Sequence, residues 1–165
     1  MKRVIVIGCP GSGKSVFSRA LHEKTGLPLV HLDLLFWNPD RTYVSREVFL
    51  ERLRPILASD AWIIDGNYAS TMELRIKACD TVIFLDYPTE VCLEGALARR
   101  GCERPDMPWA ENPGEELDEE FFRFIQSYAQ DSRPQVLKLL ACYPEKKQII
   151  FRTRDEAERF LSELV

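Results

Sequence analysis

Residues 8–15 read Gly-Cys-Pro-Gly-Ser-Gly-Lys-Ser and match the pattern G-x-x-x-x-G-K-[ST]. The apolar run at residues 4–7 predicts a strand just before this segment, and periodic apolar residues after it predict a helix. A strand, a glycine-rich turn and a helix in this order form a phosphate-binding loop. The glycines let consecutive N–H groups point at one phosphate, and the helix adds the positive end of its dipole. A glycine-rich turn with a chance lysine, the alternative, does not account for this context.

The loop predicts a nucleoside triphosphate ligand, and we take ATP as the donor with Mg²⁺ as its counter-ion. Lys14 would reach the β- and γ-phosphates, and the Ser15 hydroxyl would bind the Mg²⁺. The expected nucleotide-binding residues here are Gly8, Pro10, Gly11, Ser12, Gly13, Lys14, Ser15 and Val16. Cys9 lies inside the loop, where N–H groups can lower the pKa of a thiol; the other interpretation is a residue that only fills the loop.

Three aspartates, Asp33, Asp65 and Asp86, each stand at the end of an apolar segment. In an open parallel sheet the carboxyl ends of the strands lie at one edge, and ligands bind there. Several carboxylates would therefore crowd around one triphosphate, an arrangement that needs a cation such as Mg²⁺. We predict Ser15 and Asp65 as the metal-binding residues, with Asp86 as the alternative to Asp65.

Phosphoryl transfer needs positive charge around the moving group, and several arginines are placed to supply it. Arg99, Arg100 and Arg104 flank the start of a polar, proline-containing stretch at residues 101–114, and Arg133 follows it. We interpret this stretch as a lid over the site. The predicted catalytic residues are Lys14, Asp33, Arg100, Arg104 and Arg133, because the guanidinium fork suits bidentate phosphate contacts. The alternative is that these arginines are solvated at helix ends and in the loop.

Strand and helix patterns alternate along the chain. Strands are predicted at residues 4–7, 29–32, 62–64, 81–85 and 148–151, with Asp33 at the end of the second. Helices are predicted at residues 14–24, from a Ser45 cap to about 57, and at 70–78, 89–100, 115–131, 134–142 and 154–164. Pro55 should bend or restart the helix that follows Ser45, and Thr89 should cap the helix predicted at residues 89–100. This order predicts one α/β domain over residues 1–165, with a parallel sheet covered by helices on both faces.

Composition narrows the function further. The net charge of −4 provides no basic field for nucleic acid or a membrane, and no apolar run is long enough to span a bilayer. Five scattered cysteines without CxxC spacing indicate reduced thiols. A cleaved signal peptide would destroy the phosphate-binding loop, so we predict a cytoplasmic protein. The oligomeric state has no readable pattern.

Longer segments resemble a known family. They are residues 8–15, His31-Leu-Asp-Leu-Leu-Phe-Trp37, Trp62-Ile-Ile-Asp-Gly-Asn-Tyr68, residues 82–86 and Arg104-Pro-Asp-Met107, and they are distributed over most of the chain. The sequence resembles the adenylate-kinase-like branch of P-loop kinases, which includes shikimate and gluconate kinases, and within it the FlaR-type "DNA topology modulation protein" family. The resemblance implies a three-layer P-loop NTPase fold with sheet order 2-3-1-4-5. It also implies a short lid at about 101–114 and an acceptor-binding segment at about 33–60.

The resemblance assigns roles to some residues. Asp33 stands where the related kinases orient or deprotonate the acceptor hydroxyl, with a helix or turn cap as the alternative. Asp65 resembles the aspartate that holds a Mg²⁺-bound water. Arg152 and Arg154 follow the last strand, where the relatives place the adenine, and are predicted to bind the nucleotide.

The predicted substrate-binding residues are Asp33, Trp37, Asp65, Tyr68 and Arg75. Trp37 and Tyr68 could stack on an acceptor ring or form the pocket wall. Arg75 could face the acceptor or form a surface salt bridge. The two histidines, His22 and His31, have no partner pattern and are expected to be structural.

We predict an ATP-dependent kinase for a small acceptor, with a nucleoside or nucleotide as candidates. Where an adenylate kinase would carry Asp-Gly-Phe-Pro-Arg, residues 65–69 read Asp-Gly-Asn-Tyr-Ala, and the missing arginine argues against AMP. One alternative is an ATPase whose acceptor is water. Another is a nucleotide-gated regulatory or DNA-associated protein, which the family name favours and the acidic net charge argues against.

Overall fold

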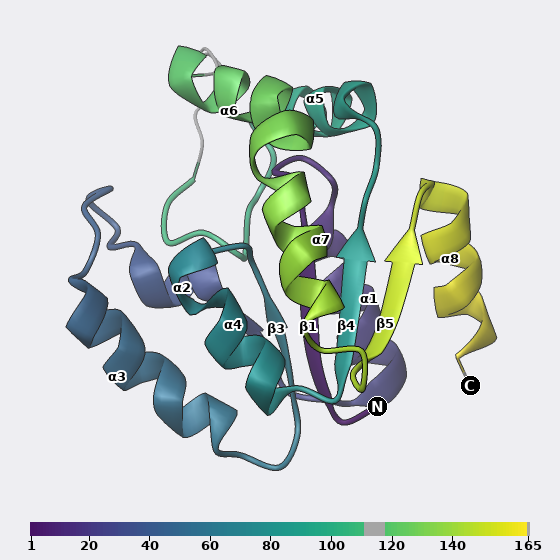
Figure 1. The fold of residues 1–165 in the computed structure, drawn as a ribbon. Helices are drawn as coiled ribbons and strands as arrows, with labels where there is room; N and C mark the ends of the chain where they lie inside the picture. Colours follow the sequence, from purple (N-terminus) through teal and green to yellow (C-terminus); the bar gives the residue numbers. More distant parts are fainter. Residues whose placement is uncertain (111–117, 165) are drawn as a thin grey trace.

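Five parallel strands form one sheet at the centre of the molecule (Figure 1). The structure is a computed structural model that describes residues 1–110 and 118–164. The strands are β1 (Arg3–Gly8), β2 (Leu29–His31), β3 (Trp62–Asp65), β4 (Thr81–Leu85) and β5 (Lys147–Phe151). Their order is β2-β3-β1-β4-β5, which confirms the predicted order 2-3-1-4-5.

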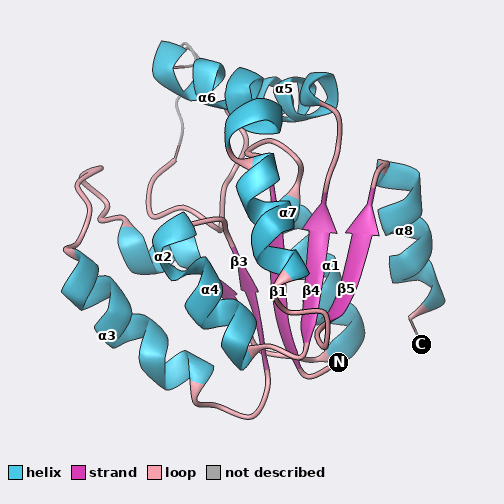
Figure 2. Ribbon diagram, viewed as in Figure 1, coloured by secondary structure: helices cyan, strands magenta, loops and turns pink. Residues whose placement is uncertain are grey.

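Helices cover both faces of this sheet (Figure 2). They are α1 (Lys14–Thr25), α2 (Leu32–Phe36), α3 (Arg46–Leu57), α4 (Ala69–Ala78), α5 (Thr89–Ala98), α6 (Glu119–Asp131), α7 (Arg133–Ala141) and α8 (Arg154–Glu163). Helices α1 and α8 pack on one face, and α3, α4 and α7 pack on the other. Helices α5 and α6 lie beyond the carboxyl ends of the strands, at the top of Figure 1. The three-layer P-loop fold expected from the sequence is therefore observed.

The alternation of side chains along β1 explains the two cores. Val4 and Val6 belong to the apolar cluster on the α1 side, whereas Ile5 and Ile7 belong to the cluster on the α4 side. Successive side chains of a strand point to opposite faces, so a strand buried on both faces is apolar at every position. The run at residues 4–7 has this property, and all four side chains are fully buried.

Local structure departs from the predictions at three places. Asp33 does not end a strand, because β2 stops at His31 and Asp33 lies in the first turn of the short helix α2. Thr89 is the first residue of α5 and Pro88 takes the cap position. Pro55 does not restart its helix, since α3 continues past it to Leu57; a proline this close to the end removes a single hydrogen bond.

Two predicted segments fall partly outside the described residues. The lid predicted at 101–114 is described as a loop up to residue 110, and the helix predicted to begin at 115 is described from Glu119, with Asp118 as its cap. None of the helices in the described ranges has the length and apolar character needed to cross a membrane.

The sheet brings the ends of all five strands to one edge. Gly8 pairs with Leu85, Val6 and His31 both pair with Asp65, and Leu85 pairs with Phe151, so these strands end at nearly the same level. The turn after each strand therefore opens toward the same region, which lies beneath α5 and α6 in Figure 1.

Candidate active site

The phosphate-binding loop is tightly packed and has unused polar groups. Gly11 and Gly13 adopt φ angles of 83° and 89°, and a Cβ at Gly11 would lie 2.0 Å from the carbonyl oxygen of Cys92 in α5. The Lys14 ammonium donates to the carbonyls of Gly8 (2.9 Å) and Cys9 (3.2 Å). The hydroxyl of Ser12 is buried without a hydrogen-bond partner. Burial lowers the pKa of Lys14, so an anion beside it would be stabilising.

A turn after β3 connects this loop to the neighbouring part of the site. The side chain of Asn67 accepts from the Gly8 N–H (3.1 Å) and donates to the Gly8 carbonyl (2.6 Å). The next residue, Tyr68, has a φ of 37°, in the left-handed region that non-glycine residues rarely adopt. A shift of this turn would therefore move the phosphate-binding loop as well.

Arg75 holds the turn from beneath. Its side chain is fully buried, and its guanidinium donates to the carbonyls of Gly66 (3.0 Å), Asn67 and Tyr68 (3.2 Å). Burial lowers the pKa of Arg75 to about 10, so the group is charged at neutral pH. Both sequence interpretations therefore need correction. Arg75 is not on the surface, and its donors are directed at the backbone and not at an acceptor.

Asp33 and Tyr68 form a hydrogen-bonded pair at the edge of the site. The Tyr68 hydroxyl donates to Oδ1 of Asp33 at 2.5 Å. Burial raises the pKa of Asp33, and the negative charges of Asp65 and Asp106 raise it further, against the opposing influence of Tyr68 and Lys14. Burial also raises the pKa of Tyr68 far above its usual range, so the tyrosine stays neutral and acts as the donor. Asp33 is thus a more basic carboxylate than an exposed one.

Asp65 is paired with His31. The Nδ1 atom of His31 lies 2.7 Å from Oδ2 of Asp65, and both side chains are buried. The two residues are register partners in β2 and β3. His31 was expected to be structural, and its partner, which no sequence pattern indicated, is the Asp65 carboxylate.

The loop at residues 101–110 reaches the phosphate-binding loop through Asp106. The Ser15 hydroxyl donates to Oδ2 of Asp106 at 3.0 Å, and Arg104 donates to the same oxygen at 2.8 Å. Asp106 is only 5% exposed. Burial alone would raise its pKa, but the hydrogen bond and charge of Arg104 hold the pKa of Asp106 at about 2. The Asp106 carboxylate therefore accepts a hydrogen bond from the Ser15 hydroxyl, which was predicted to bind Mg²⁺.

Asp86 is occupied by two arginines. Arg133 binds both of its oxygens, at 2.8 and 2.9 Å, and Arg152 binds Oδ2 as well. Asp86 is therefore unsuited to the metal role that was left open for it. Neither Arg133 nor Arg152 lines the cavity described below. This position does not agree with the catalytic role predicted for Arg133 or with the nucleotide-binding role predicted for Arg152.

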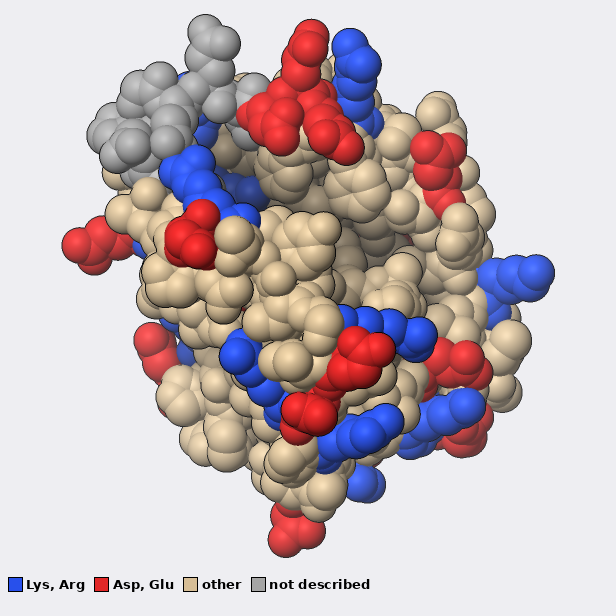
Figure 3. Space-filling view, turned by 90° about the vertical axis from the view of Figure 1, so that its left-hand side faces the viewer, with Lys and Arg blue, Asp and Glu red and all other residues tan. Residues whose placement is uncertain are grey.

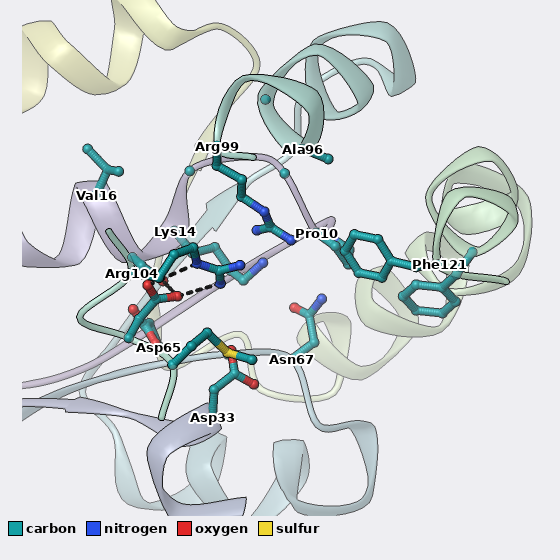
Figure 4. Close-up of a pocket in the computed structure, with 18 of the residues that line it drawn as sticks. Pro10, Lys14, Val16, Asp33, Asp65, Asn67, Ala96, Arg99, Arg104 and Phe121 are labelled. Carbon is teal, nitrogen blue, oxygen red and sulfur yellow. Dashed lines mark hydrogen bonds and ion pairs between the residues drawn. The ribbon is translucent and has the colours of Figure 1, made fainter. Parts of the chain in front are cut away.

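A single cavity of about 1490 Å³ joins these elements. Figure 3 shows a hollow on the face that lies at the left of Figure 1. In Figure 4, Lys14, Arg99 and Arg104 point into the cavity from one side, and Asp33, Asp65 and Asn67 line another part of its wall. The predicted site residues that line it are Pro10, Gly11, Gly13, Lys14, Ser15, Val16, Asp33, Trp37, Asp65, Tyr68, Arg100, Arg104 and Arg154. Gly8, Ser12, Arg75, Arg133 and Arg152 lie outside it.

The donor set fits Mg²⁺ held together with a nucleotide. Ser15 and Asp106 place a hydroxyl and a carboxylate 3.0 Å apart beside the phosphate-binding loop, and Asp65 also lines the cavity. Within residues 1–110 and 118–164, no group of three or more histidine, cysteine, aspartate or glutamate side chains is assembled to hold a metal. Mg²⁺ commonly takes one or two protein ligands and completes its shell with phosphates and water, and this arrangement is of that kind.

Cys9 is buried against Cys92. The hydrogen bond between the two thiols and their burial raise the pKa of Cys9. Of the two interpretations given for Cys9, the packing agrees with a residue that fills the loop.

Several residues of the site were missed by sequence reasoning. Asn67 and Asp106 lay inside the segments that carried the family resemblance, but neither had a motif-defined role. Trp109 lines the cavity from the 101–110 loop, and its ring meets that of Trp37 at 5.6 Å in a T-shaped contact. Its position beside Pro108, in an otherwise polar loop, is the signal that could have found it.

Comparisons with known proteins give the fold. No protein-family model matches the sequence, and no curated protein matches it. Among solved structures, a shikimate kinase from Bacteroides thetaiotaomicron matches with a TM-score of 0.61 at 20% identity, over 99% of this chain and 96% of that chain. A shikimate kinase from Acinetobacter baumannii in complex with shikimate matches with 0.63 at 16%, over 98% and 92%. A gluconokinase from Sinorhizobium meliloti 1021 matches with 0.60 at 15%, over 99% and 89%.

The chain thus has the P-loop NTPase fold in the form found in small P-loop kinases. Identities of 15–20% define the fold and leave the reaction to be argued from the site. The finer resemblance to FlaR-type proteins stays a prediction.

Proposed function

We propose that this protein is an ATP-dependent phosphotransferase that moves the γ-phosphate to a hydroxyl group of a small acceptor. The observation that carries the proposal is that one cavity holds both a phosphate-binding loop and a basic carboxylate, Asp33. Its volume of about 1490 Å³ exceeds the roughly 300–1,000 Å³ of pockets that take a single small ligand. A donor and an acceptor together would occupy such a space.

The donor half is formed by the loop at residues 8–15. Its N–H groups and Lys14 would bind the β- and γ-phosphates, while Arg99, Arg100 and Arg104 line the cavity above them. Positive charge at these positions stabilises the phosphoryl oxygens as the bond to the leaving group breaks. Mg²⁺, held by Ser15 with Asp65 or Asp106, would neutralise further phosphate charge when bound. The guanidinium of Arg154 lies over the Tyr87 ring at 5.8 Å and is placed to contact the nucleoside part of the donor.

The acceptor half is organised by Asp33. Its carboxylate would accept a hydrogen bond from the acceptor hydroxyl and take the proton as the new P–O bond forms. Tyr68 keeps the carboxylate in place through Oδ1. The raised pKa makes Asp33 a better proton acceptor than an ordinary aspartate.

Nucleosides and nucleotides are the candidate acceptors suggested by the resemblance to adenylate-kinase-like enzymes.

All five cysteines are free thiols, which fits a reducing compartment such as the cytoplasm.

The proposal is tested with Mg-ATP labelled in the γ-phosphate and a panel of nucleosides, nucleotides and small alcohols. We expect one class of acceptor to raise ADP release above the basal rate and to carry the label. Lys14→Ala should abolish transfer and weaken ATP binding, and Asp33→Asn should slow transfer with ATP binding retained. Asp131→Asn, a change at an exposed carboxylate outside both the cavity and the segment at about 33–60, is the matched control. ADP release that no acceptor stimulates would contradict the proposal and indicate an ATPase or a nucleotide sensor.

A further inference from the structure

The walls of the cavity differ in chemistry between its two halves. The donor half contains the cations Lys14, Arg99, Arg100 and Arg104. The cavity is also lined by five aromatic or sulfur-containing residues, of which Tyr68 bonds Asp33, and we call this group the acceptor wall: Trp37, Tyr68, Met72, Met107 and Trp109. Such a surface favours an apolar ring over a polyhydroxylated chain.

The aromatic members of the acceptor wall are rigidly supported. Trp37 packs edge-on against Phe36 at 5.1 Å, and the Tyr68 ring lies 5.0 Å from Phe36 and 5.2 Å from Phe49. Trp109 is joined to this cluster by its contact with Trp37 at 5.6 Å. Because Trp109 belongs to the 101–110 loop, a flat ring entering here can take the place of one tryptophan against the other and retain an aromatic contact.

Two arginines that would serve an anionic acceptor are engaged elsewhere. The donors of Arg75 are held by three backbone carbonyls, and the Arg133 guanidinium by Asp86. Arg41, the cation that lines the cavity beside the acceptor wall, is stacked over the Trp109 ring at 5.6 Å. Among the described residues in and beside the acceptor wall, a carboxylate or phosphate on the acceptor would therefore meet apolar side chains and one guanidinium that already stacks on a ring.

The negative charges of the site also disfavour an anionic acceptor relative to an uncharged one. Asp33 experiences the negative charges of Asp65 and Asp106, which raise its pKa in addition to the effect of burial. A second anion would be repelled by the Asp33 carboxylate itself and by whichever of Asp65 and Asp106 does not hold Mg²⁺, whereas an uncharged hydroxyl compound would not.

From these observations we infer that the acceptor is an uncharged compound that carries a flat ring and a hydroxyl group, so that a nucleoside is accepted in preference to its monophosphate or to a sugar acid. The inference rests on the proposed function, since it describes the acceptor of that reaction. The ring packs on Trp37 and Trp109, and the hydroxyl is presented to Asp33.

Binding separates this inference from the transfer reaction. The intact protein is saturated with Mg²⁺ and a non-hydrolysable ATP analogue, and the probes are titrated by calorimetry. The probes are adenosine, cytidine, guanosine, thymidine and uridine, their 5′-monophosphates, shikimate and gluconate. We expect at least one nucleoside to bind, and to bind at least tenfold more tightly than its own monophosphate and than either acid.

Two variants test whether the ring of the acceptor packs on Trp109. Trp109→Leu should weaken nucleoside binding by about tenfold, within the range found for base–aromatic stacking, with binding of the ATP analogue unchanged. Tyr143→Leu is the matched control, because Tyr143 lies outside the cavity and its hydroxyl donates to Glu73. Equal losses in both variants would overturn the placement of the ring.

The remaining outcomes are also decisive. Tighter binding of a monophosphate, shikimate or gluconate than of every nucleoside would overturn the inference, and phosphate transfer to such an anion would do so while upholding the kinase. Failure of every probe to bind would likewise count against an uncharged ring. Nucleoside binding without any transfer would uphold the acceptor wall and remove the proposed phosphotransferase.

Discussion

Arg75→Met tests whether the turn at residues 66–68 depends on the buried guanidinium beneath it. Methionine keeps much of the aliphatic volume but removes the donors to the carbonyls of Gly66, Asn67 and Tyr68. Each buried carbonyl that loses its donor costs about 1–3 kcal/mol. The substitution also ends the cost of burying a charge, which offsets part of this loss. Since Asn67 and Tyr68 are only half-buried, water can partly replace the donor. We therefore expect about 3 kcal/mol in total, the lower bound for three carbonyls.

Urea unfolding followed by circular dichroism measures this change directly. For a chain of this size, 1 kcal/mol corresponds to about 2–4 °C in Tm, so a decrease of roughly 6–12 °C should accompany it. Arg123→Met in α6 is the control, because Arg123 is exposed and its pair with Glu119 at 3.8 Å is solvated. That change should cost less than about 0.5 kcal/mol.

A second measurement follows the effect into the site. Because Asn67 bonds both backbone groups of Gly8, loosening of the turn should weaken binding of a fluorescent ATP analogue in Arg75→Met and leave it unchanged in Arg123→Met. A free energy of unfolding within about 1 kcal/mol of the parent protein would refute the reasoning, since it would mean that the three carbonyls need no donor.

Other predictions address the two loops and the carboxylates. Because burial raises the pKa of Asp33, the acid limb of a pH–rate profile should lie above the value of about 3.9 for an exposed aspartate, and it should disappear in Asp33→Asn. Gly11→Ala places a Cβ 2.0 Å from Cys92 O and should abolish ATP binding in a fluorescence titration. Gly26→Ala, with a φ of 69° and open space, should leave ATP binding intact and cost only backbone strain of about 1 kcal/mol. Asp106→Asn should weaken Mn²⁺ binding in the presence of ATP by about fivefold, as measured by electron paramagnetic resonance, since one nearby negative charge is lost; an unchanged affinity would remove Asp106 from the metal site.

The fold was predictable because its signals are local. The apolar runs at residues 4–7 and 82–85 have no polar position, which is typical of strands buried on both faces, and the glycine-rich loop fixes the first turn. The short helix α2 was missed, since five residues carry too little periodicity to distinguish a helical turn from a strand end. This helix matters for the site, because its first turn places Asp33 within hydrogen-bonding distance of the Tyr68 hydroxyl.

The roles of charged residues were harder to predict because they depend on partners far away in the sequence. Arg133 and Asp86 are 47 positions apart, and Ser15 and Asp106 are 91 apart. An arginine suited to phosphate is equally suited to a carboxylate, so residue type alone does not choose between them. Arg104, the lid arginine that was expected near the phosphates, likewise forms an ion pair with a carboxylate, that of Asp106.

The contacts that close the 101–110 loop lead to a further consequence. Asp106 binds the hydroxyl of Ser15, which a nucleotide-bound Mg²⁺ would use, and Trp109 packs on Trp37, which an acceptor ring would use. The loop contacts and the ligands therefore depend on the same atoms, so each ligand must replace a loop contact as it enters. A hydrogen bond and an aromatic contact of this kind each contribute about 1 kcal/mol, which is small against the binding energy of a triphosphate or a stacked ring. These loop contacts would thus not prevent either ligand from binding. Arg104, which bonds the same Asp106 carboxylate, would then be available to neutralise phosphate charge.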